Sequence, residues 1–217
     1  MKKHFLLFIL SATFAITSHG QAWFGIGVGG TVGHTFLQET LPIGGSRTEI
    51  FMPIEVSKTG MFDISLRRST LGYIDLKYLS DFEVSLIEFQ AVEASFVYKA
   101  FFGGRRAKTR PFVGGGAKLG FFQEGSVTIY DDSNMGTGTI VELNEFNEGW
   151  ESVNRVRYGL VGEAGLAFRT GKRSMIQLGL VYDFEAAQVF KTDSGVAPED
   201  NSFLGNLGTL CRLAIKL

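Results

Sequence analysis

Two long runs of alternating residues, joined by a short turn, constrain the fold of this chain more than any other feature. In residues 155–169 one parity is apolar and the other is charged or glycine-rich, and residues 174–190 repeat this arrangement. Successive side chains leave a pleated strand on opposite sides, so a period of two predicts strands. Both runs exceed 14 residues, whereas ordinary strands average about 5–6 residues. Strands of this length, with one apolar face and one charged face, are typical of a barrel that spans a bilayer.

The same alternation recurs along the chain and predicts an all-β fold, a single antiparallel barrel of eight strands. Short turns alternate with longer or more polar connections, as in barrels with short periplasmic turns and longer outer loops. Arg68 and Thr70 interrupt the apolar parity of the third strand. Either a bulge turns Arg68 inward, or residues 68–70 form a turn and the barrel has ten strands. Besides the two strands above, the predicted strands are 22–36, 47–57, 61–78, 83–101, 110–122 and 203–217.

Several irregularities are predicted within this plan. Residues 37–46 contain a proline and two glycines and are predicted to form a loop. Pro53 suggests a bulge in the second strand, because proline donates no hydrogen bond to a ladder. The apolar parity of the fourth strand shifts near residue 91, which a one-residue bulge would produce. The alternation of residues 127–129, together with Val141, suggests a hairpin that rises beyond the membrane.

The first 20 residues resemble a secretory signal peptide. Lys2 and Lys3 precede a 12-residue apolar core, which is too short to cross a bilayer as a helix. Cleavage is expected before Gln21, leaving residues 21–217 as one outer-membrane barrel domain. No later stretch has 18 consecutive apolar residues, so any membrane crossing must use strands. The predicted location is therefore the cell outer membrane.

Composition narrows the function further. Gly accounts for 28 residues and Phe for 20, an enrichment typical of tightly packed barrels with aromatic rings at the interfaces. The net charge of −1 gives no indication of a nucleic-acid partner. The single cysteine, Cys211, allows no intrachain disulfide, and its parity places it on the apolar face of the last strand.

Charged side chains of both signs collect on the parity that is expected to face the lumen. Two interpretations follow: a lumen closed by ion pairs, or an ion path. The closed lumen is favoured, because an eight-stranded barrel is only just wide enough to hold its own side chains. The expected lumen charge network consists of Glu88, Glu93, Arg110, Lys118, Arg155, Arg157, Glu163, Asp183, Glu185 and Arg212.

No catalytic, metal or cofactor site is predicted, and the protein is expected not to be an enzyme. A lipid-modifying hydrolase would have to use His34, the single histidine of the mature chain, and no serine lies close to it in sequence. The acidic connection 123–151 lacks the spacing of a calcium loop and is interpreted as solvated. The segment GIGVGG lies within a strand rather than between a strand and a helix, so it fails as a nucleotide-binding loop.

Three stretches carry a resemblance to a known family. They are WFGIGVGGTVGH, the pair SLIEFQAVEASFVYKAFF and RPFVGGGAKLGFF, and the pair YGLVGEAGLAFRTGKR and MIQLGLVYDF. Together they resemble the small outer-membrane β-barrel proteins of the PorT-like porin-family type, and the resemblance covers nearly all of the mature chain. It implies a barrel in the outer membrane and leaves the function open. One branch of the family belongs to a protein secretion system, and nothing in this chain indicates that branch.

The expected function is that of an integral outer-membrane barrel with a structural or interaction role. Its partners would be outer-membrane lipid and, through the loops or periplasmic turns, a protein of unknown identity. The alternative is a secreted soluble barrel, similar to lipocalins, that binds an apolar ligand. The two differ in which parity faces inward, because a soluble binder would bury Leu178, Leu180, Tyr182 and Phe184.

Overall fold

The chain folds into strands throughout the part that the computed structural model describes, residues 21–35, 40–77, 83–104, 107–130, 139–143, 153–188 and 203–217. The predicted signal peptide lies outside these residues. The strands are β1 (Gln21–Thr35), β2 (Thr40–Glu55), β3 (Gly60–Lys77), β4 (Glu83–Phe101), β5 (Thr109–Tyr130), β6 (Thr139–Leu143), β7 (Val156–Arg169), β8 (Ser174–Gln188) and β9 (Phe203–Lys216).

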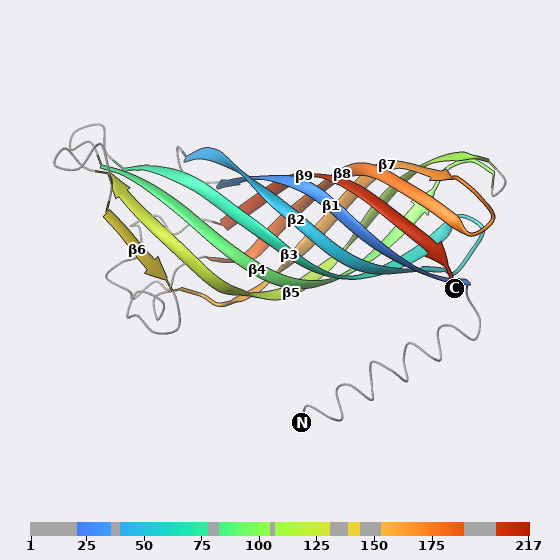
Figure 1. The fold of residues 1–217 in the computed structure, drawn as a ribbon, viewed down its shortest axis with the longest axis horizontal. Helices are drawn as coiled ribbons and strands as arrows, with labels where there is room; N and C mark the ends of the chain where they lie inside the picture. The colour runs from blue at the N-terminus through green and yellow to red at the C-terminus, as the bar shows by residue number, and fades with distance from the viewer. Residues whose placement is uncertain are drawn as a thin grey trace, which may run out of the picture.

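Eight of these strands close into an antiparallel barrel, as the sequence predicted. Neighbours in sequence pair with each other, β5 pairs with β7, and β1 pairs with β9 to close the ring. Figure 1 shows β1 beside β9, with the start of β1 and the end of β9 at the same end of the barrel. We call this the turn end, because the short connections 56–59 and 170–173 also lie there. The opposite end is the loop end.

The short strand β6 adds nothing to the ring and pairs only with β5. Val127 faces Val141 across this hairpin, which confirms the predicted extension of the fifth strand. In Figure 1 the hairpin stands at the loop end, beyond the closed part of the barrel. The described residues include no helix that is both apolar enough and long enough to cross a membrane.

Alternation along each strand separates an outer wall from an interior. In β1, Trp23 is 2% exposed and the next residue, Phe24, is 49% exposed. In β8, Val181 is fully buried, whereas Leu180 is 54% exposed. This is the parity predicted from the sequence, and it follows because successive side chains of a strand point to opposite faces.

Apolar side chains occupy three levels of the interior. The turn end is filled by a cluster that we call the turn-end plug, and a small aliphatic cluster lies in the middle. Toward the loop end the buried apolar residues include Leu71, Ile87, Phe89, Ala91 and Phe122. The turn-end plug consists of Trp23, Phe51, Met61, Phe101, Phe112, Ala167, Met175 and Ala214.

The second strand is longer than predicted. It begins at Thr40, so residues 40–46 are strand rather than loop. One extra residue of β2 is accommodated between Ile43 and Arg47 in the pairing with β3, and Gly44 and Gly45 lie within this bulge. The bulge predicted at Pro53 is wrong. That proline pairs in register with Asp63, and the pairing of β2 with β1 is interrupted beside it without a shift, because proline offers no donor to the ladder.

The third and fourth strands are more regular than predicted. β3 runs unbroken through residues 68–70, so the ten-stranded alternative is wrong, and Arg68 points outward rather than into the lumen. β4 keeps its odd-numbered residues inward from Ile87 to Phe101, so the predicted phase shift near residue 91 does not occur. The register shift at that level belongs to β5, where Gln123 is the extra residue between Phe122 and Glu124.

Glycines allow strands to approach closely inside the barrel, and Gly159 is the clearest case. A Cβ built on Gly159 would lie 1.9 Å from the backbone oxygen of Phe184 on the neighbouring strand. We expect Gly159→Ala to lower the free energy of unfolding by about 1–3 kcal/mol, because the strands must separate to accept the methyl group. Urea unfolding in detergent micelles measures this. Gly104→Ala is the control, since nothing lies within 4 Å of a Cβ there, and an equal loss in both variants would contradict the packing argument.

Candidate functional site

The charged lumen is the candidate site, and the structure gathers eight of the ten predicted network residues inside the barrel. They come from β4, β5, β7, β8 and β9. Glu88 and Arg155 are exposed instead. Glu88 faces outward because β4 keeps its odd-numbered residues inward from Ile87 to Phe101, and Arg155 precedes the first residue of β7. The eight buried residues are Glu93, Arg110, Lys118, Arg157, Glu163, Asp183, Glu185 and Arg212.

Six further charged residues, missed as site candidates, are buried with them. The signal for them was present, because they occupy the inward parity of β2, β3 and β4. The missed residues are Arg47, Glu49, Glu55, Asp63, Arg67 and Lys99. Glu55 accepts a hydrogen bond from Arg169 at 2.8 Å.

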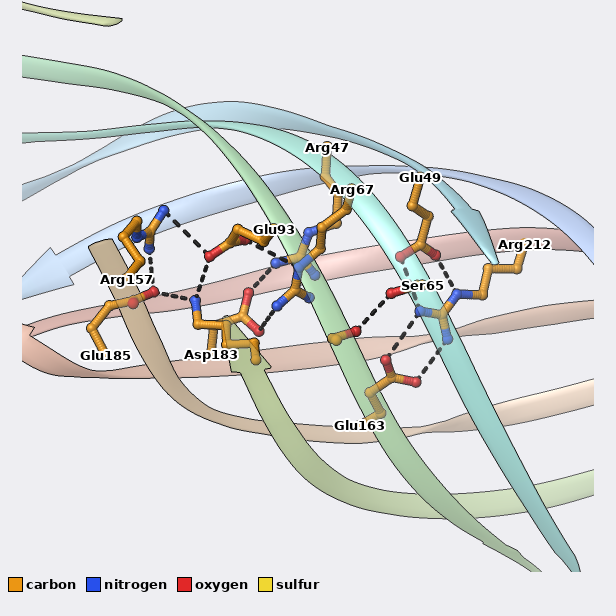
Figure 2. Close-up of polar contacts among 12 residues, drawn as sticks. Arg47, Glu49, Ser65, Arg67, Glu93, Arg157, Glu163, Asp183, Glu185 and Arg212 are labelled. Atoms are coloured by element: carbon orange, nitrogen blue, oxygen red, sulfur yellow. Dashed lines mark hydrogen bonds and ion pairs between the residues drawn. The ribbon is translucent and has the colours of Figure 1, made fainter. Parts of the chain in front are cut away.

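The buried charges form two layers, which Figure 2 shows along the barrel. The loop-side layer has four cations and three anions, and the turn-side layer has two cations and three anions. The loop-side layer consists of Arg47, Arg67, Lys118, Arg157, Glu93, Asp183 and Glu185. The turn-side layer consists of Lys99, Arg212, Glu49, Asp63 and Glu163.

In the loop-side layer each carboxylate bridges cations from different strands. Glu93 accepts hydrogen bonds from Arg67 at 3.1 Å and from Lys118 at 3.0 Å. Asp183 binds Arg67 at 3.0 Å through one oxygen and Arg47 through the other. These contacts join β2, β3, β4, β5 and β8 across the lumen, which ties together strands that do not pair with one another.

A second part of this layer surrounds Glu185. Its Oε1 accepts from both Lys118 and Arg157, and Arg157 Nη1 lies 3.4 Å from Glu93 Oε1. Arg157 also lies over the ring of Phe122, 4.7 Å from its centre. This cation–π contact places the apolar loop-end residues directly against the layer.

The turn-side layer is centred on Arg212 and Lys99. Arg212 Nη1 lies 2.8 Å from Glu163 and 3.3 Å from Asp63, and its Nε and Nη2 both donate to Glu49. Lys99 Nζ lies 2.6 Å from Asp63 and 2.7 Å from Glu163, and donates to Gln177 at 2.8 Å. All the charges of this layer are thus paired inside the protein, as buried charges must be.

A neutral pair lies between the two charged layers. Ser65 and Ser95 share a hydrogen bond of 2.6 Å between the layers, and Figure 2 shows Ser65 in this position. Arg110 lies apart from both layers at the turn end. It donates to the backbone oxygen of Lys58 at 2.9 Å and lies over Phe101.

The remaining candidates do not assemble into a chemical site within the described residues. His34 lies in β1 opposite Gly205, and its side chain is outside the described part, as is most of the acidic connection 123–151. Among the described residues, no group of three or more His, Cys, Asp or Glu side chains is arranged to hold a metal ion. Cys211 is exposed on the outer wall, as its parity predicted.

The outer wall completes the geometry of the site. Large apolar side chains are exposed on all eight strands, whereas the two charged layers lie inside. A wall of this kind is stable against hydrocarbon and would be costly in water, so it identifies a barrel that spans a bilayer. Members of the wall that are 44–62% exposed include Phe24, Ile26, Val28, Leu66, Phe96, Val113, Leu119, Leu160, Leu180, Leu213 and Ile215.

Solved structures of outer-membrane barrels share this fold, although no protein-family model matches the chain and no curated protein does. Neisserial surface protein A is 15% identical, with 90% of this chain and 97% of that chain covered and a TM-score of 0.50. OprG from Pseudomonas aeruginosa is 9% identical, with 92% and 97% covered and a TM-score of 0.53. A major outer membrane protein from Thermus thermophilus is 13% identical, with 88% and 99% covered and a TM-score of 0.49. The first two likenesses show that this chain has the fold of the small outer-membrane β-barrels.

Proposed function

We propose that the protein is an integral outer-membrane barrel with a closed lumen, which serves a structural or interaction role through its outer loops. The single observation that carries the proposal is the inversion of polarity, with apolar side chains outside and paired charges inside. The predicted signal peptide is consistent with export. The PorT-like resemblance belongs to this proposal as well, supported by the three sequence stretches that carry it.

The packing of the interior supports a lumen that is closed to ions rather than one that conducts them. Beneath the two charged layers lies the turn-end plug, whose Trp23, Phe51 and Phe112 are each 2% exposed. Lys99 and Arg212 lie against this plug through contacts with the rings of Phe112 and Phe51, at 4.7 and 4.9 Å. A permeating ion would have to separate several ion pairs and then cross an apolar cluster.

We therefore expect no steady large conductance when the folded barrel is inserted into planar lipid bilayers, because an eight-stranded lumen is filled by its own side chains. Heat-modifiable gel migration of the same preparation verifies that the barrel is folded. A lack of conductance then reflects a closed lumen rather than a lack of folded protein. Long-lived large openings from a preparation that is fully folded would overturn the closed lumen.

The soluble, lipocalin-like alternative required the apolar parity of the strands to face the interior, and it does not. Leu178 and Leu180 are 44% and 54% exposed, whereas a lipocalin-like binder would bury them around its ligand. Within the described residues, every charged side chain of the two layers is paired with an opposite charge, so an enzymatic role would rest on His34. We propose that the protein acts without catalysis, through what its loops or turns contact.

A further inference from the structure

The two charged layers differ in how completely their donors are used. In the turn-side layer, all three nitrogens of Arg212 donate to carboxylates, and Lys99 has three acceptors around its ammonium group. In the loop-side layer Arg47 donates only through Nη2, to Asp183. Its Nε and Nη1, and Nη1 of Arg67, have no acceptor among the residues that the structure describes.

Two neutral side chains near these guanidinium groups also lack hydrogen-bond partners among the described residues. Ser69 and Asn206 are each 1% exposed, and neither the Ser69 hydroxyl nor the Asn206 amide has a hydrogen-bond partner within the described residues. Burying a polar group without a partner is unfavourable, because the group loses its hydrogen bonds to water. Such groups are therefore expected to be satisfied by something other than the protein.

The register of the strands brings these groups to one sector of the lumen. Ser69 is the pairing partner of Arg47, and Asn206 is the pairing partner of Asp183, to which Arg47 is bound. Figure 2 shows Arg47, Arg67 and Asp183 together in the lumen.

Glycines line the wall of this sector. Gly208 lies two residues beyond Asn206 on the same face of β9. A Cβ built on Gly208 would lie 3.8 Å from Arg47 Nη1, so the guanidinium group reaches over bare backbone. Gly33 pairs with Asn206 from β1. A Cβ built on Gly33 would lie 2.5 Å from the backbone oxygen of Gly72, so backbone closes the sector on that side.

Charge decides which acceptor fits best. The loop-side layer holds four cations against three anions, a local net charge of +1 among its described side chains. The turn-side layer carries the opposite excess of −1, on the far side of Ser65 and Ser95, so the positive excess is local to the loop-side layer. A neutral water would satisfy a donor but leave the positive charge in place. A monovalent anion would satisfy a donor and also neutralise that charge. Both oxygens of Asp183, the nearest carboxylate, are already bound to Arg47 and Arg67.

We propose that the lumen binds a small monovalent anion of the halide class between Arg47, Arg67, Ser69 and Asn206. The anion acts as a structural counter-ion that completes the loop-side layer, and its site does not depend on what the outer loops contact. It accepts hydrogen bonds from the two guanidinium groups, the Ser69 hydroxyl and the Asn206 amide N–H.

The test compares the thermal unfolding midpoint of the detergent-folded barrel in sodium chloride, bromide and gluconate at equal ionic strength. Because an ion that binds only the folded state raises stability by mass action, we expect the midpoint to be about 5–10 °C higher in a halide present at 100 times its Kd. Bromide anomalous scattering from crystals of the same protein should give a peak beside Arg47 and Asn206. Equal midpoints in halide and gluconate would mean that water fills the sector, and would overturn the proposal.

Asn206→Asp supplies the missing negative charge from the protein itself. We expect it to abolish the halide effect and to raise the midpoint in gluconate toward that of the wild type in chloride. Gln177→Glu is the matched control, since it makes the same amide-to-acid change in the turn-side layer and should leave the halide effect intact. A halide effect that persists in Asn206→Asp would place the ion elsewhere and refute the assignment.

Discussion

Replacing Arg212 with methionine should lower the free energy of unfolding by about 3–5 kcal/mol, the cost of removing one partner from a buried ion pair. Methionine fills much of the same volume, so the loss reports charge rather than a cavity. Glu49, Asp63 and Glu163 would remain buried around an apolar side chain, and only Lys99 would be left to offset them. Urea unfolding in detergent micelles, followed by heat-modifiable gel migration, measures the change.

Two further variants separate this effect from a general sensitivity to substitution. Arg68→Met removes an arginine whose side chain is 61% exposed on the outside, and it should change stability by less than about 1 kcal/mol. Adding Glu49→Met to Arg212→Met should recover part of the loss, because the described contacts give Glu49 no cation besides Arg212. Similar losses in Arg212→Met and Arg68→Met would contradict the layer model.

The second large effect is expected on the opposite face of the sheet. Leu180→Arg places a guanidinium group on the outer wall, where Leu180 is 54% exposed. If that wall meets hydrocarbon, the variant should lose about 2–4 kcal/mol when folded into lipid vesicles. If it met water, a surface leucine could become arginine at little cost. Unfolding in vesicles therefore tests membrane residence directly.

The matched control for this variant uses the same change at a site outside the wall. Leu217 follows the last residue of β9 and is 79% exposed. Leu217→Arg should fold and insert almost as the wild type does. Comparable stability of both arginine variants in lipid would remove the argument that the wall is lipid-facing.

The fold was predictable because one periodicity repeats over most of the chain. In β7 every second residue from Val156 to Phe168 is apolar or glycine, β1 and β8 alternate in the same way over most of their lengths, and burial follows that parity in the structure. Eight strands, their order and the closed ring follow from alternation and connection length alone. The site was predictable to the same extent, since a charge on the inward parity of such a strand has nowhere to lie but the lumen.

The wrong assignments of inward and outward faces come from places where the interior of the barrel is apolar. Near the loop end β4 presents Ile87, Phe89 and Ala91 to the lumen, so apolar residues there indicate the inside rather than the outside. A rule that equates apolar with lipid-facing inverts the strand at that point, which misplaced Glu88 and created a phase shift that does not exist. Bulges were misplaced for a related reason. Their position depends on the pairing of two strands, which no single strand reveals.

The position of Arg212 on the last strand has a consequence for biogenesis. Its carboxylate partners lie on β2, β3 and β7, up to 163 residues earlier in the chain. Until the final hairpin arrives, Lys99 is the one cation that the described contacts place against those carboxylates, and an unfinished sheet could not carry them into hydrocarbon. Entry into the bilayer and closure of the ring must then be concerted, with the nascent sheet kept in a hydrated environment until its first and last strands meet.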